Sequence, residues 1–275
     1  SKYYKSEISI NQKQLLELLE EFKGDFNKQA YNIKIQNLEQ NINIEDTGML
    51  GQKLLVNQSI EKVKTAIEHK QNSVELVYQT LLPEVYNFKG GNSKWRAISY
   101  GVSDYTGSIV NRVKNIQMAS QNVFQNTIVN PGKDFSYNDT LIKNGSHIEW
   151  KNAFIIVNGK DLQEAPGGGL CQVSTTIYRA AIKAGFPINK IRNHSLYVKY
   201  YKKHGDGLDA TIYPGAQDMT FTNNLSTPIL IQTYYTADNK NISIIYGLEE
   251  PQDSNLYGPY YSMTENPYGL TINNN

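Results

Sequence analysis

The sequence predicts an α+β protein, in which a small N-terminal α+β module precedes a larger domain that mixes helices with an antiparallel sheet. Segments with the 3.6-residue apolar period of helices are interspersed with short alternating or β-branched runs typical of strands. At 275 residues the chain is long enough for two domains. A stretch rich in Gly, Asn and Ser interrupts the pattern. The expected division is a first domain at 1–85, a linker at 86–96, a second domain at 97–247 and a tail at 248–275.

The elements of the N-terminal module follow from local periodicity. Asn11 is a suitable N-cap, and the leucines that follow it recur on one helical face. The stretch around 30–44 alternates like two strands about a turn. In order, we expect a strand at 8–10, a helix over 11–23, strands at 30–39 and 42–44, a helix over 57–69 and a strand-like run at 74–82.

The second domain shows the same kinds of signal. A strand is expected at 97–102, and apolar residues at helical spacing predict a helix over 109–124. The runs at 190–201 and 208–213 are expected to pair as antiparallel strands, because a Gly-containing turn separates them. Two further strands, at 229–235 and 241–246, are joined by a turn at 236–239.

Cys171 is the only cysteine of the chain, and it follows three successive glycines at 167–169. Behind it, Val173, Ile177, Ala180, Ala181 and Ala184 lie on one helical face, and Gly185 with Pro187 is a stop signal. Cys171 is therefore expected at the start of a helix, where the helix dipole favours a thiolate. The alternative is a small buried hydrophobic residue, which is a common role of free cysteine.

A base for such a thiol would come from the predicted strand pair. His194 lies near the start of the first strand, and pairing would bring Asp209 of the second strand close to it. Thiol, imidazole and carboxylate then match the nucleophile, base and orienting group of cysteine catalysis. The other histidines are expected in a solvated helix (His69), in a loop (His147) and in a turn (His204). A structural histidine and a surface carboxylate are the alternatives for these two residues.

The sequence predicts no metal and no cofactor, because a single cysteine without paired ligand spacing does not make a zinc motif. With 27 basic and 26 acidic residues, charge gives no reason to expect nucleic acid or an anionic membrane as a partner. No apolar run approaches the ~20 residues that span a bilayer. Because the chain begins Ser1-Lys2 without an apolar leader, we expect the ectodomain of a protein whose N-terminal anchor lies outside this sequence. The oligomeric state stays open.

Several motifs in order resemble the VanW domain family of bacterial cell-envelope proteins. They are PGGGLCQVSTTIY at 166–178, RNHS at 192–195, VKY at 198–200, GLDAT at 207–211 and DMTFTN at 218–223, with Asn111-Arg112, Asn115-Ile116 and PGKDFS at 131–136 before them. The resemblance covers roughly 97–247. Residues 1–85 are similar, more loosely, to the peptidoglycan-binding type of domain that precedes VanW domains.

The resemblance implies an L,D-transpeptidase outside a Gram-positive cell, with peptidoglycan stem peptides as donor and acceptor. Cys171 would attack the carbonyl of the third stem residue, His194 would transfer protons, and Asp209 would orient His194. Substrate contacts are expected from residues of the same motifs, namely Gly168, Gly169, Gln172, Ser174, Arg192 and Tyr200. The more familiar L,D-transpeptidase fold places its cysteine after a histidine in a Ser-x-Gly-Cys-type motif, an order this chain lacks. A cysteine amidase or endopeptidase, and a wall-binding protein without activity, are the alternatives.

Overall fold

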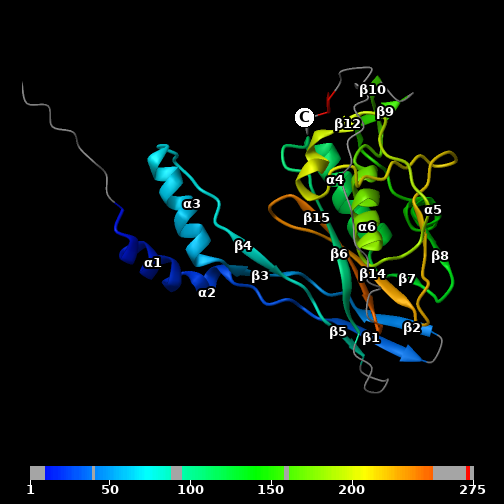
Figure 1. Ribbon diagram of the computed structural model, residues 1–275, viewed down its shortest axis with the longest axis horizontal. Helices are drawn as coiled ribbons and strands as arrows, with labels where there is room; N and C mark the ends of the chain where they lie inside the picture. Colours follow the sequence, from blue (N-terminus) through cyan, green and yellow to red (C-terminus); the bar gives the residue numbers. More distant parts are fainter. Residues whose placement is uncertain (1–9, 39–40, 88–94, 158–160, 250–270, 273–275) are drawn as a thin grey trace, which may run out of the picture. The chain divides into compact units, whose positions relative to one another are not determined.

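The structure is a computed structural model that describes residues 10–38, 41–87, 95–157, 161–249 and 271–272. The chain divides into two compact units, Ser1–Ile35 with Glu45–Tyr86 and Gln36–Ile44 with Asn87–Asn275 (Figure 1). Helices and antiparallel sheets occur together, which confirms the predicted α+β class. Most of the expected linker and tail, and the expected strand at 8–10 apart from its last residue, lie outside the described residues.

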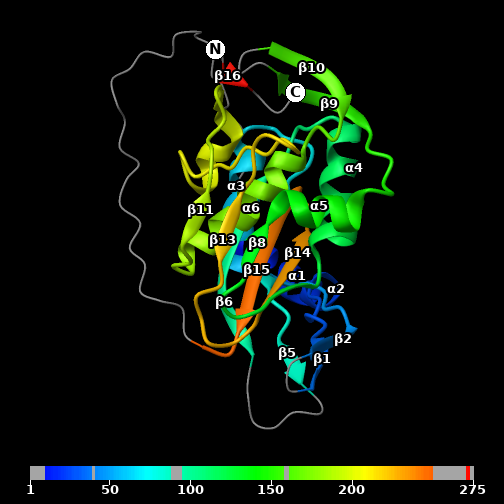
Figure 2. The ribbon, with the colours of Figure 1, turned by 90° about the vertical axis from the view of Figure 1, so that its right-hand side faces the viewer.

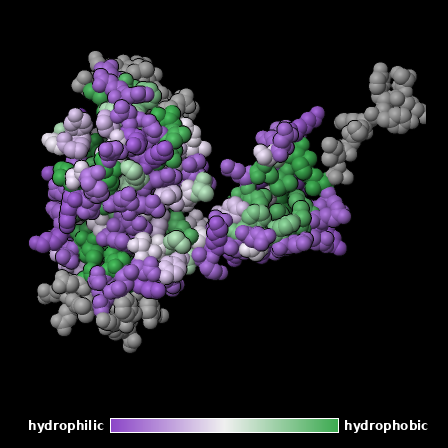
Figure 3. All heavy atoms as spheres, turned by 180° about the vertical axis from the view of Figure 1, so that it is seen from behind, coloured by the Kyte–Doolittle hydropathy of each residue, from purple (hydrophilic) through white to green (hydrophobic). Residues whose placement is uncertain are grey.

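The described part of the first unit contains three helices and a two-stranded antiparallel sheet. Its elements are α1 (Gln12–Glu21), α2 (Lys23–Phe26), β3 (Gly51–Leu54), α3 (Val56–Glu68) and β4 (Tyr78–Leu81), and β3 pairs with β4. Asn11 caps α1 by accepting a hydrogen bond from the Gln14 backbone N–H at 3.2 Å. Leu19, Leu54, Val56 and Ile60 form the apolar core. Other apolar side chains stay on the surface, among them Leu18, and apolar atoms gather on the face seen in Figure 3.

A further sheet has the strand order β2-β1-β5, from β1 (Ile33–Leu38), β2 (Asn41–Asp46) and β5 (Val85–Asn87). The first two strands confirm the predicted pair around residues 30–44. None of the helices that the structure describes is long and apolar enough to cross a membrane.

The core of the second unit is a four-stranded antiparallel sheet covered by α6 (Leu170–Lys183). The order is β6-β15-β14-β7, from β6 (Arg96–Asp104), β15 (Lys240–Gly247), β14 (Ile229–Tyr235) and β7 (Thr127–Val129). α4 (Val110–Met118) runs into the π-helical turn η1 (Ala119–Phe124), and α5 (Tyr137–Gly145) follows β8 (Asp134–Ser136). A small sheet of order β11-β13-β8 adds β11 (Ile188–Lys190) and β13 (Thr220–Thr222) (Figure 2). The predicted helices and the predicted strands at 97–102, 229–235 and 241–246 are thereby confirmed, whereas β7 and α5 were not predicted.

Helix α6 is fixed closely against β6. Gly101 makes this possible, because a Cβ at that position would lie 2.1 Å from the Thr176 backbone oxygen. Ser99 donates a hydrogen bond to the Ala180 carbonyl at 2.7 Å, and the hydroxyls of Ser103 and Thr176 are 2.7 Å apart. Polar contacts and close packing therefore set the position of the helix that begins beside Cys171.

The predicted strand pair at 190–201 and 208–213 is wrong. In the first run only Lys190, the last residue of β11, and the two-residue β12 (Tyr197–Val198) belong to strands, and 199–204 forms the 3-10 helix η2 (Lys199–His204). The run 208–213 contains no named strand, although its Thr211 backbone N–H donates to the Arg192 carbonyl at 2.7 Å. β12 pairs in parallel with β16 (Thr271–Ile272) instead. The physical reason lies in Arg179, which is 0% exposed and whose guanidinium donates to the carbonyls of Val102, Tyr201, Gly205 and Leu208. Of these, the Tyr201 and Leu208 carbonyls belong to the two predicted strands, and both accept from this side chain rather than from a neighbouring strand.

Candidate active site

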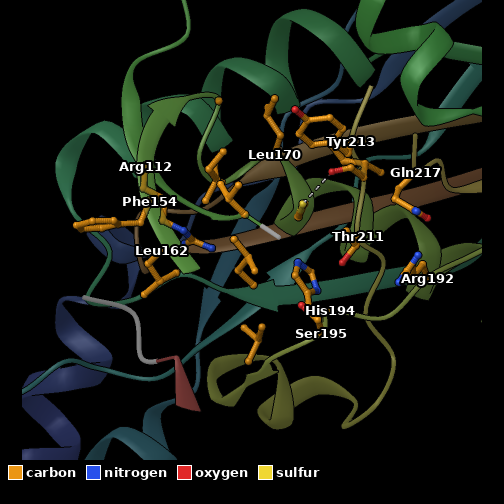
Figure 4. A pocket seen from close by; sticks show the side chains of 18 of the residues that line it. Arg112, Phe154, Leu162, Leu170, Arg192, His194, Ser195, Thr211, Tyr213 and Gln217 are labelled. Carbon is orange, nitrogen blue, oxygen red and sulfur yellow. Dashed lines mark hydrogen bonds between the residues drawn. The ribbon is translucent and has the colours of Figure 1, made fainter. Parts of the chain in front are cut away.

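The second unit contains a cavity of about 1000 Å³ at the N-terminal end of α6 (Figure 4). Its walls come from α4, the turn before α6, the segments 192–201 and 211–217, and a β-hairpin. The hairpin pairs β9 (Asn152–Val157) with β10 (Asp161–Pro166), and Phe154, Ile156 and Leu162 of this hairpin line the cavity. The sequence did not predict this hairpin.

Cys171 is the second residue of α6 and lines the cavity, half-buried. Gly169 is the N-cap of the helix and has a φ of +111°, a backbone conformation that residues other than glycine rarely adopt. The thiol lies 3.6 Å from the Ile212 carbonyl, to which it donates (dashed line in Figure 4). The glycine turn therefore presents Cys171 at a helix N-terminus, where unpaired N–H groups and the dipole favour negative charge.

His194 and Asp209 form a tight pair. The His194 Nδ1 is 2.5 Å from Asp209 Oδ2, and the same oxygen accepts the His194 backbone N–H at 2.8 Å. Asn193 donates its side-chain amide to the other carboxylate oxygen at 2.8 Å. His194 lines the cavity together with Cys171. With Nδ1 held by Asp209, Nε2 is the ring nitrogen left for the thiol.

The pKa values of these groups are coupled. Burial alone would raise the pKa of the Cys171 thiol, but the hydrogen bond and charge of His194 outweigh it, so this pKa lies below its ordinary value. Burial would lower the pKa of His194, yet its hydrogen bonds to Asp209 and Cys171 raise that pKa to about 9. For Asp209, burial is outweighed by the hydrogen bond from His194, and the pKa of the carboxyl is lowered. All three shifts favour a thiolate, an imidazolium and a carboxylate in one cluster.

Arg112 is a cavity residue to which the sequence analysis assigned no role. It lies on α4, is 9% exposed and lines the cavity. Its guanidinium donates to Ser108 Oγ at 2.7 Å, to Gln172 Oε1 at 2.6 Å and to the Tyr200 hydroxyl at 2.9 Å. The one signal in the sequence was its place in the Asn111-Arg112 motif, which says nothing about contacts.

Only some of the residues expected to contact substrate line the cavity. Gly169, Arg192 and Tyr200 line the cavity. Gln172 and Ser174 are 0% exposed and do not line it, contrary to the expectation, because both point from α6 into the core. Gln172 instead joins Arg112 to Ser103, to which it donates at 3.1 Å.

Gly168, the remaining expected substrate contact, does not line the cavity, and it has a structural reason to be glycine. A Cβ there would lie 2.7 Å from the backbone of Ala153, so the residue lets the turn pack against β9. Neither His147 nor His204 lines the cavity, and His204 ends η2. Within the described part of the chain, no group of three or more His, Cys, Asp or Glu side chains is arranged to hold a metal ion.

Comparisons with known proteins agree with the motifs. Residues 111–245 match the family described as "VanW like protein". The chain is 30% identical over 186 residues to the uncharacterized protein YoaR of Bacillus subtilis (strain 168), an overlap of 67% of this chain and 60% of the relative. The chain thus spans less than two thirds of that relative's length. No solved structure matches. The resemblance in the motifs is confirmed: residues 111–245, which contain Arg112, Cys171, His194 and Asp209, form a domain of the VanW-like protein family.

Proposed function

We propose that this domain is a cysteine acyltransferase that acts on peptidoglycan stem peptides and forms 3-3 cross-links, an L,D-transpeptidase activity. The observation that carries the proposal is that Cys171, at the start of α6, and His194, bonded to Asp209, line one cavity. A helix N-terminus, a base and a group that orients the base are what thiol catalysis requires. The VanW-like family points to the cell envelope, which supplies the substrate class.

The acylation step uses the Cys171 thiolate as nucleophile and the His194 imidazolium as acid. The Cys171 thiolate attacks the carbonyl carbon of the third stem residue, and a C–S bond forms. As the tetrahedral intermediate collapses, the C–N bond to the terminal D-Ala breaks, and the His194 imidazolium gives its proton to the leaving amine. The product is a thioester, neutral His194 and free D-Ala. Asp209 holds Nδ1 so that Nε2 carries the transferred proton.

The second step passes the acyl group to an acceptor. The amine on the third residue of another stem attacks the thioester, and His194 removes a proton from that amine as the C–S bond breaks. This restores the thiolate and the imidazolium. Water competes with the amine for the thioester, so the balance between transfer and hydrolysis depends on solvent exclusion. Phe154, Ile156 and Leu162 give the hairpin wall an apolar lining that supports transfer.

The location of the protein and the role of its first unit belong to the same proposal. The domain would act outside a Gram-positive cell, attached through an anchor outside this sequence, and the first unit would bind the wall. A cysteine amidase or endopeptidase would use the same thioester with water as acceptor. A wall-binding protein without activity would hold stems in the cavity and leave Cys171 unmodified.

The masses of the products distinguish transpeptidation, hydrolysis and binding without activity. The purified protein is incubated with disaccharide-tetrapeptide, and the products are read by mass spectrometry, with Cys171→Ser as the matched control. A dimer that has lost one D-Ala means transfer, a tripeptide alone means hydrolysis, and unchanged substrate favours binding. The proposal predicts the dimer with the unchanged protein and unchanged substrate with Cys171→Ser. A tripeptide as the sole product would replace transpeptidation by hydrolysis.

A further inference from the structure

Arg112 is a buried cation whose partners in the described part of the chain are all neutral. The three acceptors are a Ser hydroxyl, a Gln amide oxygen and a Tyr hydroxyl. A guanidinium has five N–H donors, so two remain without a partner among the described residues. The two remaining donors are Nε–H and one N–H of the terminal nitrogen that bonds Ser108. A buried charge is costly unless it is paired, and a guanidinium N–H makes a charge-assisted hydrogen bond to a carboxylate.

The other charges of the cavity agree with an anionic occupant. Its cationic lining residues, as far as the structure describes it, are Arg112, Arg192 and His194, and the Cys171 thiolate is the one anionic group among the described lining residues, since neither Asp nor Glu is among them. Asp209 does not line the cavity, and its carboxylate is already held by His194 and Asn193. A substrate carboxylate is therefore the group that would complete the charge balance of the cavity.

The guanidinium is fixed in place before any ligand arrives. Gln172, itself 0% exposed, links it to β6 through Ser103, and the Tyr200 ring lies 4.9 Å from Arg112 Cζ. Arg112 is close to the thiol, because it lines the same cavity as Cys171 and bonds Gln172, the next residue along the chain. A carboxylate on Arg112 would thus lie near the bond that Cys171 attacks.

We infer that Arg112 binds the free carboxylate of the leaving residue, so that the site selects peptides ending one residue beyond the attacked carbonyl. This rests on the proposed function, because it uses the acyl transfer at Cys171 to define the leaving residue. Arg112 would then determine specificity by charge-assisted hydrogen bonds. A stem one residue longer, or a stem with a C-terminal amide, would leave the guanidinium buried and unpaired.

The test compares a tetrapeptide stem with the same stem amidated at its C-terminus. Release of the terminal residue is measured with the unchanged protein, Arg112→Gln, Arg112→Lys and Arg192→Gln, with melting curves for each. The unchanged protein is expected to prefer the free acid by about 10- to 100-fold in kcat/KM. Arg112→Gln should lose the preference and Arg112→Lys should keep only part of it, since an ammonium group on a flexible stem keeps the charge but cannot bond Ser108, Gln172, Tyr200 and a carboxylate together. Arg192→Gln should keep the preference.

The comparison of the two substrates needs no variant, so a failure of Arg112→Gln to fold does not remove the test. Equal rates for acid and amide would overturn the inference and leave the transferase standing. A preference that disappears in Arg192→Gln and persists in Arg112→Gln would also overturn it. If neither substrate is consumed, the proposed function fails, and the inference is decided by binding: Cys171→Ala must bind the acid more tightly than the amide, and equal affinities would refute it.

Discussion

Asp209 holds His194 twice, through the ring Nδ1 at 2.5 Å and through the backbone N–H at 2.8 Å, both on the same carboxylate oxygen. The second contact fixes the backbone that carries the ring, so the carboxylate sets both the orientation and the charge of the imidazole. Arg179 fixes the backbone beside Asp209, because it donates to the carbonyl of Leu208, the preceding residue. The site therefore depends on a buried scaffold as well as on its reacting groups.

Asp209→Asn should impair catalysis without unfolding the domain. The amide keeps the size of the side chain but removes the charge that helps raise the pKa of His194. The imidazolium becomes less stable, and kcat/KM is expected to fall on the order of 100-fold or more. The measurement is release of D-Ala under single-turnover conditions. A variant within a factor of two of the unchanged protein would exclude Asp209 as the orienting group.

The thiol should be reactive near neutral pH. His194 lowers the pKa of Cys171, so the midpoint of iodoacetamide labelling is expected below the free-thiol value of about 8.5. In His194→Ala the stabilising partner is gone while burial remains, so the midpoint should move upward. A small free thiol is the reference compound. A midpoint at or above that of the reference would contradict an activated nucleophile.

The stability of the His194–Asp209 pair should depend on pH in a defined window. Asp209 helps raise the pKa of His194 above 6.5, so its stabilisation is complete below about pH 6.5 and is lost as pH rises through the folded-state pKa. The pKa of Asp209 is lowered, so its contribution is present above about pH 4 and is lost as pH falls. Melting temperatures of Cys171→Ala and of Cys171→Ala with Asp209→Asn should therefore differ most between about pH 4.5 and 6.5. If the difference in melting temperature between the two variants instead grew toward pH 9, the assigned direction of the two pKa shifts would be contradicted.

Gly101→Ala should disturb the packing of α6 on the sheet. Its Cβ would lie 2.1 Å from the Thr176 backbone oxygen, which no rotamer change can relieve. We expect a loss of about 3 kcal/mol in the free energy of unfolding, at the upper end of overpacking effects. The control is Gly24→Ala, because a Cβ there meets nothing within 4 Å. Similar melting curves for the two variants would show that α6 does not pack as described.

The parts of the site that could be predicted from the sequence are those encoded by short-range patterns. The glycine run and the 3.6-residue period placed Cys171 at a helix start, where the structure has it. Asp209 was expected beside His194 and lies there, although the predicted strands are absent. Arg179 instead bonds one carbonyl from each of them, those of Tyr201 and Leu208.

The role of Arg112 could not be predicted from short-range sequence patterns. Its acceptors are 4, 60 and 88 residues away in the chain, and only the fold brings them together. The β9–β10 hairpin was missed for a related reason. β9 carries the continuous apolar run AFIIV at 153–157 instead of the alternation that marks a strand with one buried face, and such a short run does not by itself distinguish a strand from a buried helix segment.

The central claim is that Cys171 forms a thioester with the stem peptide, and the intact mass of the protein tests it most directly. The protein is mixed with tetrapeptide stem, quenched in acid and analysed by mass spectrometry, followed by peptide mapping. The account predicts a mass increase equal to the mass of the stem minus that of free D-Ala, mapped to Cys171 and absent from Cys171→Ala. Cross-linked product formed by a folded Cys171→Ala protein would contradict it.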